Sequence, residues 1–264
     1  MIKLIVTDLD GTLFTTDKRL PPDFDKVLQQ LKQKGITFAV ATGRNFEGTK
    51  SYFADKINDM YFICDNGAFI MAHDKLIRCV TLEESLCHRV FEAVKEYGAI
   101  DVLACGLKGT YYTHCCDAMQ RRMDNYYTPM IFVEDMRDIE DQLFKISYSD
   151  FNGGPTVSGS LEYLQDKFGE ELSIQPSGGV WIDSMHKSVN KGEGVKALQE
   201  ILGITDQETL VFGDYYNDIP MLENAKNVFV VANAPEDVKK YAARIVKSND
   251  EYGVTESIKE FVLK

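Results

Sequence analysis

Two short acidic runs hold most of the residues in this chain that could do chemistry. The first is Asp8-Leu9-Asp10-Gly11-Thr12, and the second is Gly213-Asp214-Tyr215-Tyr216-Asn217-Asp218. Each run follows an apolar segment, residues 2 to 7 and residues 209 to 212, of the kind typical of a buried parallel strand. Because sites in open parallel sheets form at the carboxyl ends of the strands, we predict that both runs meet at one edge of a sheet.

The four aspartates Asp8, Asp10, Asp214 and Asp218 indicate what this edge could do. Carboxylates gathered in one cleft repel each other and need a cation between them. A small cluster of hard oxygen ligands suits Mg²⁺. Phosphoryl transfer through an aspartyl-phosphate uses a divalent ion held beside a further carboxylate, and these aspartates could hold the ion and supply that carboxylate. This is the leading hypothesis from the residues alone.

A calcium-binding loop of the EF-hand kind is the sharpest competing explanation of the first run. Such a loop needs Gly at its sixth position and a bidentate Glu at its twelfth. Counted from Asp8, those positions hold Leu13 and Arg19, so the calcium loop is excluded. Taken alone, the first run also fits a plain turn, and the second fits a solvated acidic loop.

Two basic segments could hold a phosphate. Thr42-Gly43-Arg44 ends the apolar run at residues 36 to 41, where a hydroxyl, a backbone N–H and a guanidinium can bind phosphate oxygens. Lys191-Gly192 precedes a helix expected at residues 193 to 202. A lysine at a helix N-terminus interacts unfavourably with the positive end of the helix macrodipole, unless an anion lies nearby. Taken alone, each segment also fits a turn with an exposed basic side chain.

The order of these four segments along the chain resembles a known family. Further matching segments are Asp65-Asn66-Gly67-Ala68, Pro220-Met221-Leu222 and Asn233-Ala234, so the resemblance covers both ends of the chain. The chain resembles the haloacid dehalogenase-like superfamily, in its Cof-type sugar-phosphatase branch with a large α/β (type IIB) cap. Each segment alone is weak, but the combination is specific.

The resemblance implies a role for each matching position. Asp8 corresponds to the nucleophile that takes the phosphoryl group, and Asp10 to the general acid for the leaving alkoxide and then the base for water. The expected phosphate- and substrate-binding residues are Thr42, Gly43, Arg44, Asn66, Lys191 and Asn217. The expected metal ligands are Asp8, the backbone carbonyl of Asp10, and Asp214, with Asp218 and Asn217 as supporting groups around Mg²⁺ and Lys191.

The chemistry of two neighbouring carboxylates agrees with this division of roles. A metal-bound Asp8 stays ionised, whereas Asp10, off the metal, can hold a proton near neutral pH. The aromatic pair Tyr215-Tyr216 departs from the family pattern, in which small or polar residues are frequent at these positions.

The composition of the 264-residue chain is that of a soluble globular protein, with 44% hydrophobic and 27% charged residues. A net charge of -12 argues against nucleic acid or an anionic membrane as a partner. No apolar segment approaches the length of a membrane span, which excludes the transporting ATPases that share aspartyl-phosphate chemistry. We expect a monomer or a weak homo-oligomer that binds a small phosphorylated metabolite.

The cysteines and the N-terminus indicate the subcellular location. The six cysteines, at positions 64, 79, 87, 105, 115 and 116, show no C-x-x-C spacing. Buried, reduced thiols are the favoured interpretation. The N-terminus enters an apolar strand directly, without a charged and then apolar leader. These features predict a cytoplasmic protein.

Apolar periodicity divides the chain into a core and an insert. Strands and helices alternate at both ends. Strands are expected at 2 to 7, 36 to 41, 61 to 64, 209 to 212, 228 to 231 and 245 to 246. Helices are expected at 23 to 34, 193 to 202, 236 to 243 and 255 to 263, with a helix or turn near 46 to 53. The helix at 193 to 202 is expected to bury Ile201. This alternation predicts an α/β fold, with residues 1 to 81 and 186 to 264 forming a doubly wound, Rossmann-like parallel sheet as the catalytic core.

Residues 82 to 185 follow a different pattern. Strands expected at 102 to 105, 110 to 114, 144 to 149, 172 to 175 and 180 to 183 outnumber helices, of which two are expected at 117 to 126 and 160 to 168. Several strands follow each other too closely for parallel crossovers, so we predict an inserted α+β cap domain with an antiparallel sheet. Its first helix is expected to open with a capping box at Thr81-Leu82-Glu83-Glu84 and to end at Gly98. Substrate specificity is expected in this segment, with Arg121, Arg122, Lys145, Tyr148 and Trp181 as candidate residues.

These observations predict a Mg²⁺-dependent phosphatase that acts on a small phosphorylated metabolite, with sugar phosphates as the first expectation. One alternative is a phosphomannomutase-like phosphotransferase, which would release an isomeric phosphate instead of free phosphate. A second alternative is a non-catalytic sensor of phosphorylated metabolites. A sensor would have no chemical need for Asp10, which argues against that alternative.

Overall fold

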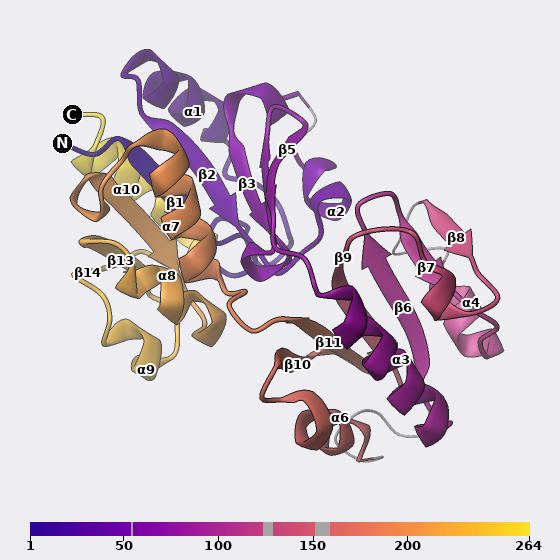
Figure 1. The fold of residues 1–264 in the computed structure, drawn as a ribbon. Helices are drawn as coiled ribbons and strands as arrows, with labels where there is room; N and C mark the ends of the chain where they lie inside the picture. Colours follow the sequence, from indigo (N-terminus) through magenta and orange to yellow (C-terminus); the bar gives the residue numbers. More distant parts are fainter. Residues whose placement is uncertain (54, 124–128, 151–158) are drawn as a thin grey trace. The chain divides into compact units, whose positions relative to one another are not determined.

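A computed structural model describes residues 1–53, 55–123, 129–150 and 159–264 (Figure 1). The chain forms two compact units, which we call the core unit (Met1–Cys79 with Asn190–Lys264) and the inserted unit (Val80–Val189). Each unit has its own sheet and its own hydrophobic clusters. The α/β class is confirmed, since the core unit carries a mainly parallel sheet and the inserted unit a second, mainly antiparallel one.

The core unit is built on an eight-stranded sheet. In spatial order its strands are β14 (Arg244–Val246), β13 (Asn227–Val231), β12 (Thr209–Gly213), β1 (Leu4–Thr7), β2 (Thr37–Ala41), β3 (Tyr61–Cys64), β4 (Phe69–Ala72) and β5 (Lys75–Cys79). The strands from β14 to β3 pair in parallel, whereas β4 and β5 pair antiparallel at one edge.

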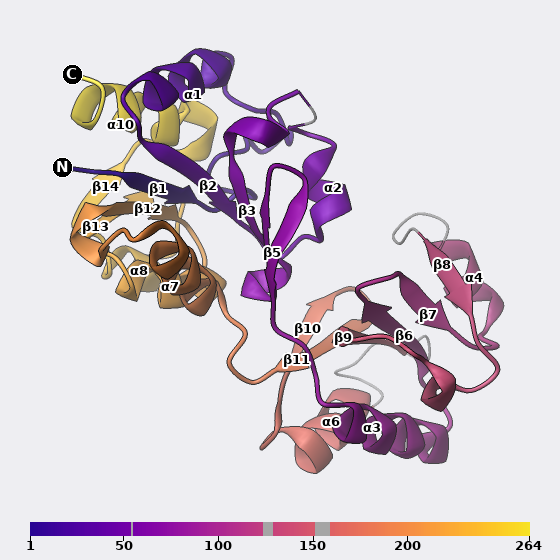
Figure 2. The same cartoon turned by 45° about the horizontal axis from the view of Figure 1, so that its top comes forward.

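Helices cover both faces of this sheet. The α-helices of the core unit are α1 (Phe24–Gln33), α2 (Phe46–Lys50), α7 (Lys191–Leu202), α8 (Ile219–Glu223), α9 (Glu236–Lys239) and α10 (Gly253–Phe261). Helices α1 and α10 lie on one face, and α7 and α8 lie on the other (Figure 1 and Figure 2). Because side chains alternate along a strand, Ile5 packs with the first pair and its neighbour Val6 with the second.

Short 3₁₀ turns join several of these elements. They are η1 (Ile57–Asp59), η2 (Asp65–Gly67), η4 (Asp206–Glu208), η5 (Tyr216–Asp218) and η6 (Asn249–Glu251) in the core unit, and η3 (Met136–Asp138) in the inserted unit. Two of them, η2 and η5, directly follow the ends of β3 and β12, where the sequence places candidate site residues.

The antiparallel β4–β5 hairpin has no clear sequence signal. Its two-residue turn, His73-Asp74, has φ of +51° and +62°, which suits a type I′ turn. Such turns are usually signalled by Asn-Gly or Asp-Gly, and neither is present here. The first four residues of β5, Lys75 to Arg78, are exposed, so the strand lacks the apolar alternation that would mark it.

Several expected helices of the core unit differ from the structure. Helix α2 ends at Lys50 and not at residue 53, and α10 runs from Gly253 to Phe261 and not from 255 to 263. Helix α7 begins at Lys191 rather than at Glu193, and Ile201 on this helix is 49% exposed instead of buried. Ile201 lies six positions after Val195, which turns it about 120° around the helix from that buried residue, so it falls outside the face that buries Val195 and Leu198. Helix α9 covers only Glu236–Lys239 of the expected residues 236 to 243.

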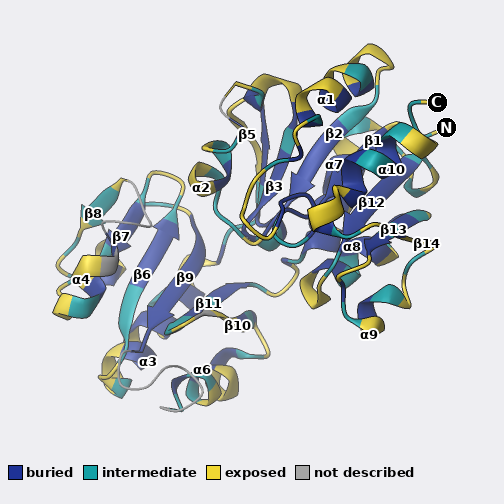
Figure 3. Cartoon of the chain, turned by 180° about the vertical axis from the view of Figure 1, so that it is seen from behind, coloured by how far each residue is buried: buried dark blue, intermediate teal, exposed yellow. Residues whose placement is uncertain are grey.

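The inserted unit contains a six-stranded sheet. In spatial order its strands are β10 (Leu172–Gly178), β11 (Trp181–His186), β9 (Leu143–Ser149), β6 (Asp101–Gly106), β7 (Thr110–Tyr112) and β8 (Met130–Phe132). All neighbours are antiparallel except β7 and β8, and β8 is not predicted from the sequence. Buried residues follow the strands of each unit, and exposed residues lie mainly on helix surfaces and loops (Figure 3).

Helices pack on both faces of the sheet of the inserted unit. Helices α3 (Glu84–Tyr97) and α6 (Ser160–Phe168) share a cluster with Ala104 of β6. Helix α4 (Asp117–Met123) packs through its methionines against Leu103, the next residue of β6, and therefore on the other face. The expected residues 124 to 126 of that helix lie outside the described part of the chain.

The predicted capping box of α3 is wrong. The N-cap is Glu83 and its side chain makes no capping hydrogen bond, so Glu84 is the first residue of the helix and not the third. The predicted end is confirmed, because Gly98 has φ of +78° and its N–H bonds to the carbonyl of Val94.

The burial of the side chains bears on the remaining expectations for the inserted unit, which concern the candidate specificity residues and the cysteines. Tyr148 lies fully buried in the cluster under α3 and α6, so it is a core residue of the inserted unit. Lys145 is also buried, while Trp181 is partly exposed and Arg121 exposed. The side chain of Arg122 lies outside the described residues. All six cysteines are free, but only Cys64, Cys87 and Cys105 are buried, which corrects the expectation that all are.

Among the described residues, none of the helices combines the length and the apolar character that a membrane crossing requires.

A substitution at Gly67 tests how closely the backbone packs in the core unit. Its φ is +103°, and an added Cβ would lie 2.3 Å from the carbonyl oxygen of Asn190, the residue before α7. Gly67→Ala should lower the free energy of unfolding by about 3 kcal/mol or more, from strain and overpacking together. Urea denaturation followed by circular dichroism measures this.

Gly35→Ala is the matched control. Gly35 has φ of +69° but nothing within 4 Å of an added Cβ, so it should show only the backbone term of about 1–2 kcal/mol. Equal losses in the two variants would show that the turn at Gly67 and the start of α7 move apart freely.

Candidate active site

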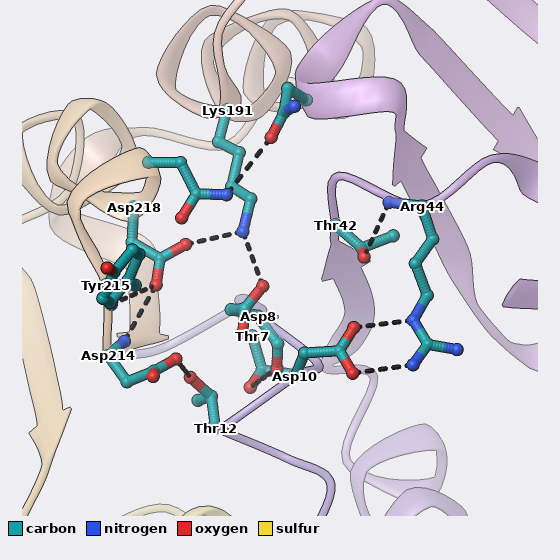
Figure 4. Close-up of polar contacts among 12 residues, drawn as sticks. Thr7, Asp8, Asp10, Thr12, Thr42, Arg44, Lys191, Asp214, Tyr215 and Asp218 are labelled. Carbon is teal, nitrogen blue, oxygen red and sulfur yellow. Dashed lines mark hydrogen bonds and ion pairs between the residues drawn. The ribbon is translucent and has the colours of Figure 1, made fainter. Parts of the chain in front are cut away.

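The carboxyl ends of four parallel strands bring the candidate residues together. Strand β1 pairs with β12 and β2, and β2 pairs with β3, all in parallel, so the loops that follow them lie at one edge of the sheet. Asp8 follows β1, Thr42 follows β2, Asp65 follows β3 and Asp214 follows β12. Figure 4 shows the side chains from three of these loops, together with Lys191, around one centre.

Lys191 lies at the centre of this group. Its ammonium Nζ is 2.5 Å from Oδ1 of Asp8 and 2.6 Å from Oδ1 of Asp218 (Figure 4). The exposed fractions of the three side chains are 1%, 8% and 0%, so water screens these charges little. Burial alone would lower the pKa of Lys191, but the two carboxylates outweigh it and hold that pKa above its ordinary value.

The start of α7 fixes the position of Lys191. Asn190 is the N-cap, and its side chain accepts a hydrogen bond from the N–H of Glu193. A cation in the first turn opposes the helix macrodipole, and the two carboxylates offset that cost. Glycine at position 192 lets the helix approach α8, because an added Cβ would lie 2.3 Å from the carbonyl oxygen of Pro220.

Asp218 holds the loop after β12 in place. While Oδ1 binds Lys191, Oδ2 accepts hydrogen bonds from the N–H groups of Asp214 at 2.8 Å and Tyr215 at 3.0 Å. One buried carboxylate therefore fixes both the lysine and the backbone on which Asp214 lies. The sequence resemblance predicts Asp218 as a supporting group beside Lys191, and the structure places the two side chains in contact.

Three carboxylates form a cluster that could hold a metal ion. One oxygen each from Asp8, Asp214 and Asp218 lies within 4.8 Å of the others. Thr12 donates a 2.6 Å hydrogen bond to Oδ1 of Asp214, and Gly11 leaves the space that Asp214 occupies. The donor set consists of oxygens only, which suits a hard cation such as Mg²⁺.

The electrostatics of the cluster agree with a cation. Three carboxyl groups face a single lysine, so the group would carry excess negative charge if all three were ionised. Burial raises the pKa of Asp8 to about 8 and also raises the pKa of Asp214. A cation placed among these oxygens would favour their ionised forms. The residues present therefore fit a divalent metal.

Asp10 makes contacts that the sequence does not predict. Its carboxylate accepts hydrogen bonds from Nε and Nη2 of Arg44 at 2.6 and 2.7 Å, and from Nζ of Lys18 at 2.6 Å. The guanidinium of Arg44 lies over the rings of Tyr52 and Phe14, at 5.2 and 5.6 Å from their centroids.

These contacts favour the ionised form of Asp10. Burial would raise the pKa of Asp10, but the hydrogen bonds and charges of Arg44 and Lys18 outweigh it and lower the pKa. In this arrangement Asp10 is a carboxylate bound by two cations, and its side chain lies outside the three-carboxylate cluster.

The loops after β2 and β3 are joined by hydrogen bonds. The buried hydroxyl of Thr42 accepts a hydrogen bond from the N–H of Arg44, and the carbonyl of Thr42 accepts one from the N–H of Asn66. Asn66 has φ of +52° and accepts a 3.2 Å hydrogen bond from the side chain of Asn217. Gly43 lies beneath that amide, since an added Cβ would be 3.2 Å from Oδ1 of Asn66.

The structure therefore brings the predicted residues into two connected groups. One contains Asp8, Lys191, Asp214 and Asp218, and the other contains Asp10, Arg44, Thr42, Gly43, Asn66 and Asn217. Sequence reasoning missed four contributing side chains, Thr12, Lys18, Tyr52 and Asn190. Thr12 belongs to the first acidic run, but no pattern marks Lys18 or Tyr52.

Comparison with known proteins gives the class of this site. The model of the haloacid dehalogenase-like hydrolase family matches residues 5–258. The 5-amino-6-(5-phospho-D-ribitylamino)uracil phosphatase YbjI of Escherichia coli is 31% identical over 97% of this chain and 95% of its own. The phosphatase YitU of Bacillus subtilis, named for the same substrate, is 27% identical over 98% and 97%.

A solved structure described as a sugar phosphatase of haloacid dehalogenase subclass IIB has a similar fold. It covers 99% of this chain and 100% of its own, with a TM-score of 0.77 and 21% identity. The chain belongs to the haloacid dehalogenase-like hydrolase family, which confirms the resemblance found in its sequence. Within that family it is a phosphatase.

Lys191→Met should test the central charge group. The substitution keeps the approximate shape and removes the ammonium, which leaves two buried carboxylates without their partner. We expect the free energy of unfolding to fall by about 3–5 kcal/mol near neutral pH. The loss should grow as the pH rises from 5 to 8, because removing the ammonium raises the pKa of Asp8 further above its value in the parent, so that ionisation costs the folded variant more than it costs the parent.

Lys226→Met is the control, since Lys226 is exposed and pairs with Asp206 at 3.7 Å. It should change stability by about 1 kcal/mol or less at either pH. Urea denaturation of both variants at the two pH values measures this. A Lys191→Met variant as stable as the parent at pH 8 would contradict the assigned electrostatics.

Proposed function

We propose that this protein is a Mg²⁺-dependent phosphatase that hydrolyses a small phosphorylated metabolite through an aspartyl-phosphate on Asp8. One observation carries the proposal: a buried lysine binds Asp8 and Asp218 at once, beside a further carboxylate of Asp214. This arrangement holds a nucleophilic carboxylate in one position and balances part of its charge.

The proposed reaction has two steps. In the first, an oxygen of Asp8 forms a bond to phosphorus while the bond from phosphorus to the ester oxygen breaks, and Asp10 gives a proton to the leaving alkoxide. In the second, Asp10 takes a proton from water as that water attacks the phosphorus, which releases phosphate and restores Asp8.

For Asp10 to carry a proton, its contacts with Arg44 and Lys18 must open first. A phosphate dianion that enters the site offers both cations another partner. The same anion can accept hydrogen bonds from the hydroxyl of Thr42 and the N–H of Gly43, and can bind Lys191. Asn66 and Asn217 lie beside these groups as further substrate contacts.

The metal would be held by Asp8, the backbone carbonyl of Asp10, and Asp214, with Asp218 and Asn217 in support. When bound, Mg²⁺ would supply positive charge that offsets the negative charge on the phosphoryl oxygens.

The substrate class follows from the chemistry and from the relatives. Phosphorylated sugars are the expectation from the sequence resemblance, and two relatives are named for a phosphorylated ribityl chain that carries a uracil. We propose a phosphorylated sugar or sugar alcohol, with the inserted unit selecting among leaving groups. A phosphate-release screen over sugar, nucleotide and cofactor phosphates tests this. An isomeric phosphate in place of free phosphate would indicate a phosphotransferase instead.

Asp8→Asn should abolish turnover and leave the fold intact. The amide keeps the shape of the side chain and loses the charge needed for attack, so kcat should fall by several orders of magnitude. Asp237→Asn, which makes the same change at an exposed surface carboxylate, should leave kcat unaltered. Near-normal kcat in Asp8→Asn would refute the covalent mechanism.

Asp214→Ala should weaken Mg²⁺ binding, because sites with few protein ligands suffer when one is lost. Isothermal titration calorimetry of the metal measures this without reference to activity, and Asp206→Ala, at a partly exposed carboxylate that pairs with Lys226, is the control. Chelation should abolish activity reversibly. Full activity of metal-stripped protein in excess chelator would show that the reaction needs no divalent ion.

A further inference from the structure

Tyr215 and Tyr216 stand out in the loop after β12. Their side chains are 55% and 49% exposed, which is unusual for two adjacent aromatic residues next to a buried charge group. The rings pack on each other in an edge-to-face arrangement, with centroids 5.0 Å apart and planes at 70°. They therefore form one aromatic surface rather than two separate side chains.

The backbone of this pair is held by the residues of the candidate active site. The N–H of Tyr215 bonds to Oδ2 of Asp218, whose other oxygen binds Lys191. On either side of the pair, Asp214 joins the three-carboxylate cluster and Asn217 bonds to Asn66. The rings are thus exposed side chains on a fixed backbone, one residue from a proposed metal ligand.

A purely structural role does not explain the pair. Neither ring belongs to the two hydrophobic clusters that the described residues of the core unit form. The turn is already fixed by Asp218, which binds two N–H groups and needs no particular side chain at positions 215 and 216. Exposed aromatic residues fixed beside a site are typical of a surface that binds a ligand.

We propose that Tyr215 and Tyr216 determine specificity by stacking against a planar ring in the leaving group of the substrate. This inference rests on the proposed phosphatase function and narrows its substrates to phosphate esters that carry a heterocyclic or aromatic ring. The phosphate end binds at Asp8 and Lys191, whereas the tyrosine rings offer an apolar, polarisable face that suits a flat ring and gains little from a sugar hydroxyl.

A matched pair of substrates separates ring recognition from phosphate recognition. One is 5-amino-6-(5-phospho-D-ribitylamino)uracil, and the other is D-ribitol 5-phosphate, which has the same phosphorylated chain without the ring. The intact enzyme should have the higher kcat/KM for the first. The double variant Tyr215→Ala/Tyr216→Ala should lose about tenfold or more in kcat/KM for the ring-bearing ester and less than about twofold for the other.

Two further variants make the test specific. Tyr215→Phe/Tyr216→Phe keeps both rings and should retain the preference for the ring-bearing ester. Tyr241→Ala removes another tyrosine of the core unit, 40% exposed, and should change neither rate.

Three results would overturn the inference and leave the phosphatase function standing. They are an intact enzyme that prefers D-ribitol 5-phosphate, an equal loss on both esters in the alanine variant, and a phenylalanine variant as impaired as the alanine variant. Release of phosphate from no ester of the screen would instead refute the proposed function itself.

Discussion

The whole site depends on one buried ammonium placed between two buried carboxylates. Lys191 binds Asp8 in the loop after β1 and Asp218 in the loop after β12. These two loops are far apart in the sequence. Two carboxylates at this depth would be costly without that charge, and the lysine would be equally costly without them. Because the three charges compensate each other only in one geometry, they align the nucleophile, the start of α7 and the loop after β12 together.

The core unit supplies the frame that this charge group needs. Parallel strands end at one edge of the sheet, so four loops from distant parts of the sequence meet there. Helix layers on both faces bury the alternating strand residues and keep water away from Asp8 and Lys191. Close contacts at Gly67 and Gly192 bring α7 near enough for its lysine to reach Asp8.

Sequence patterns predicted the features that local chemistry determines. Short polar runs after apolar strands located Asp8 and Asp214, and the start of a predicted helix located Lys191, because strand ends and hydrophobic periodicity leave a direct mark. The patterns failed where a tertiary contact decides. Lys18 reaches Asp10 from a loop in which its own backbone has φ of +59°, and no sequence pattern predicts that conformation. The β4–β5 hairpin turns at His73-Asp74 without the usual turn residues, and its outer strand is largely exposed.

The insertion of one unit into the other bears on how the protein is made. Strand β1 pairs with β12, and Thr12 bonds to Asp214 across 202 positions of the chain. The inserted unit has emerged completely once Val189 has left the ribosome, before α7 and β12 have emerged. Domains generally fold as units during synthesis, so the inserted unit can form first. A nascent chain therefore has no assembled reaction centre until residues 191 to 218 have emerged, and a product truncated before Lys191 carries the nucleophile without the lysine that binds it.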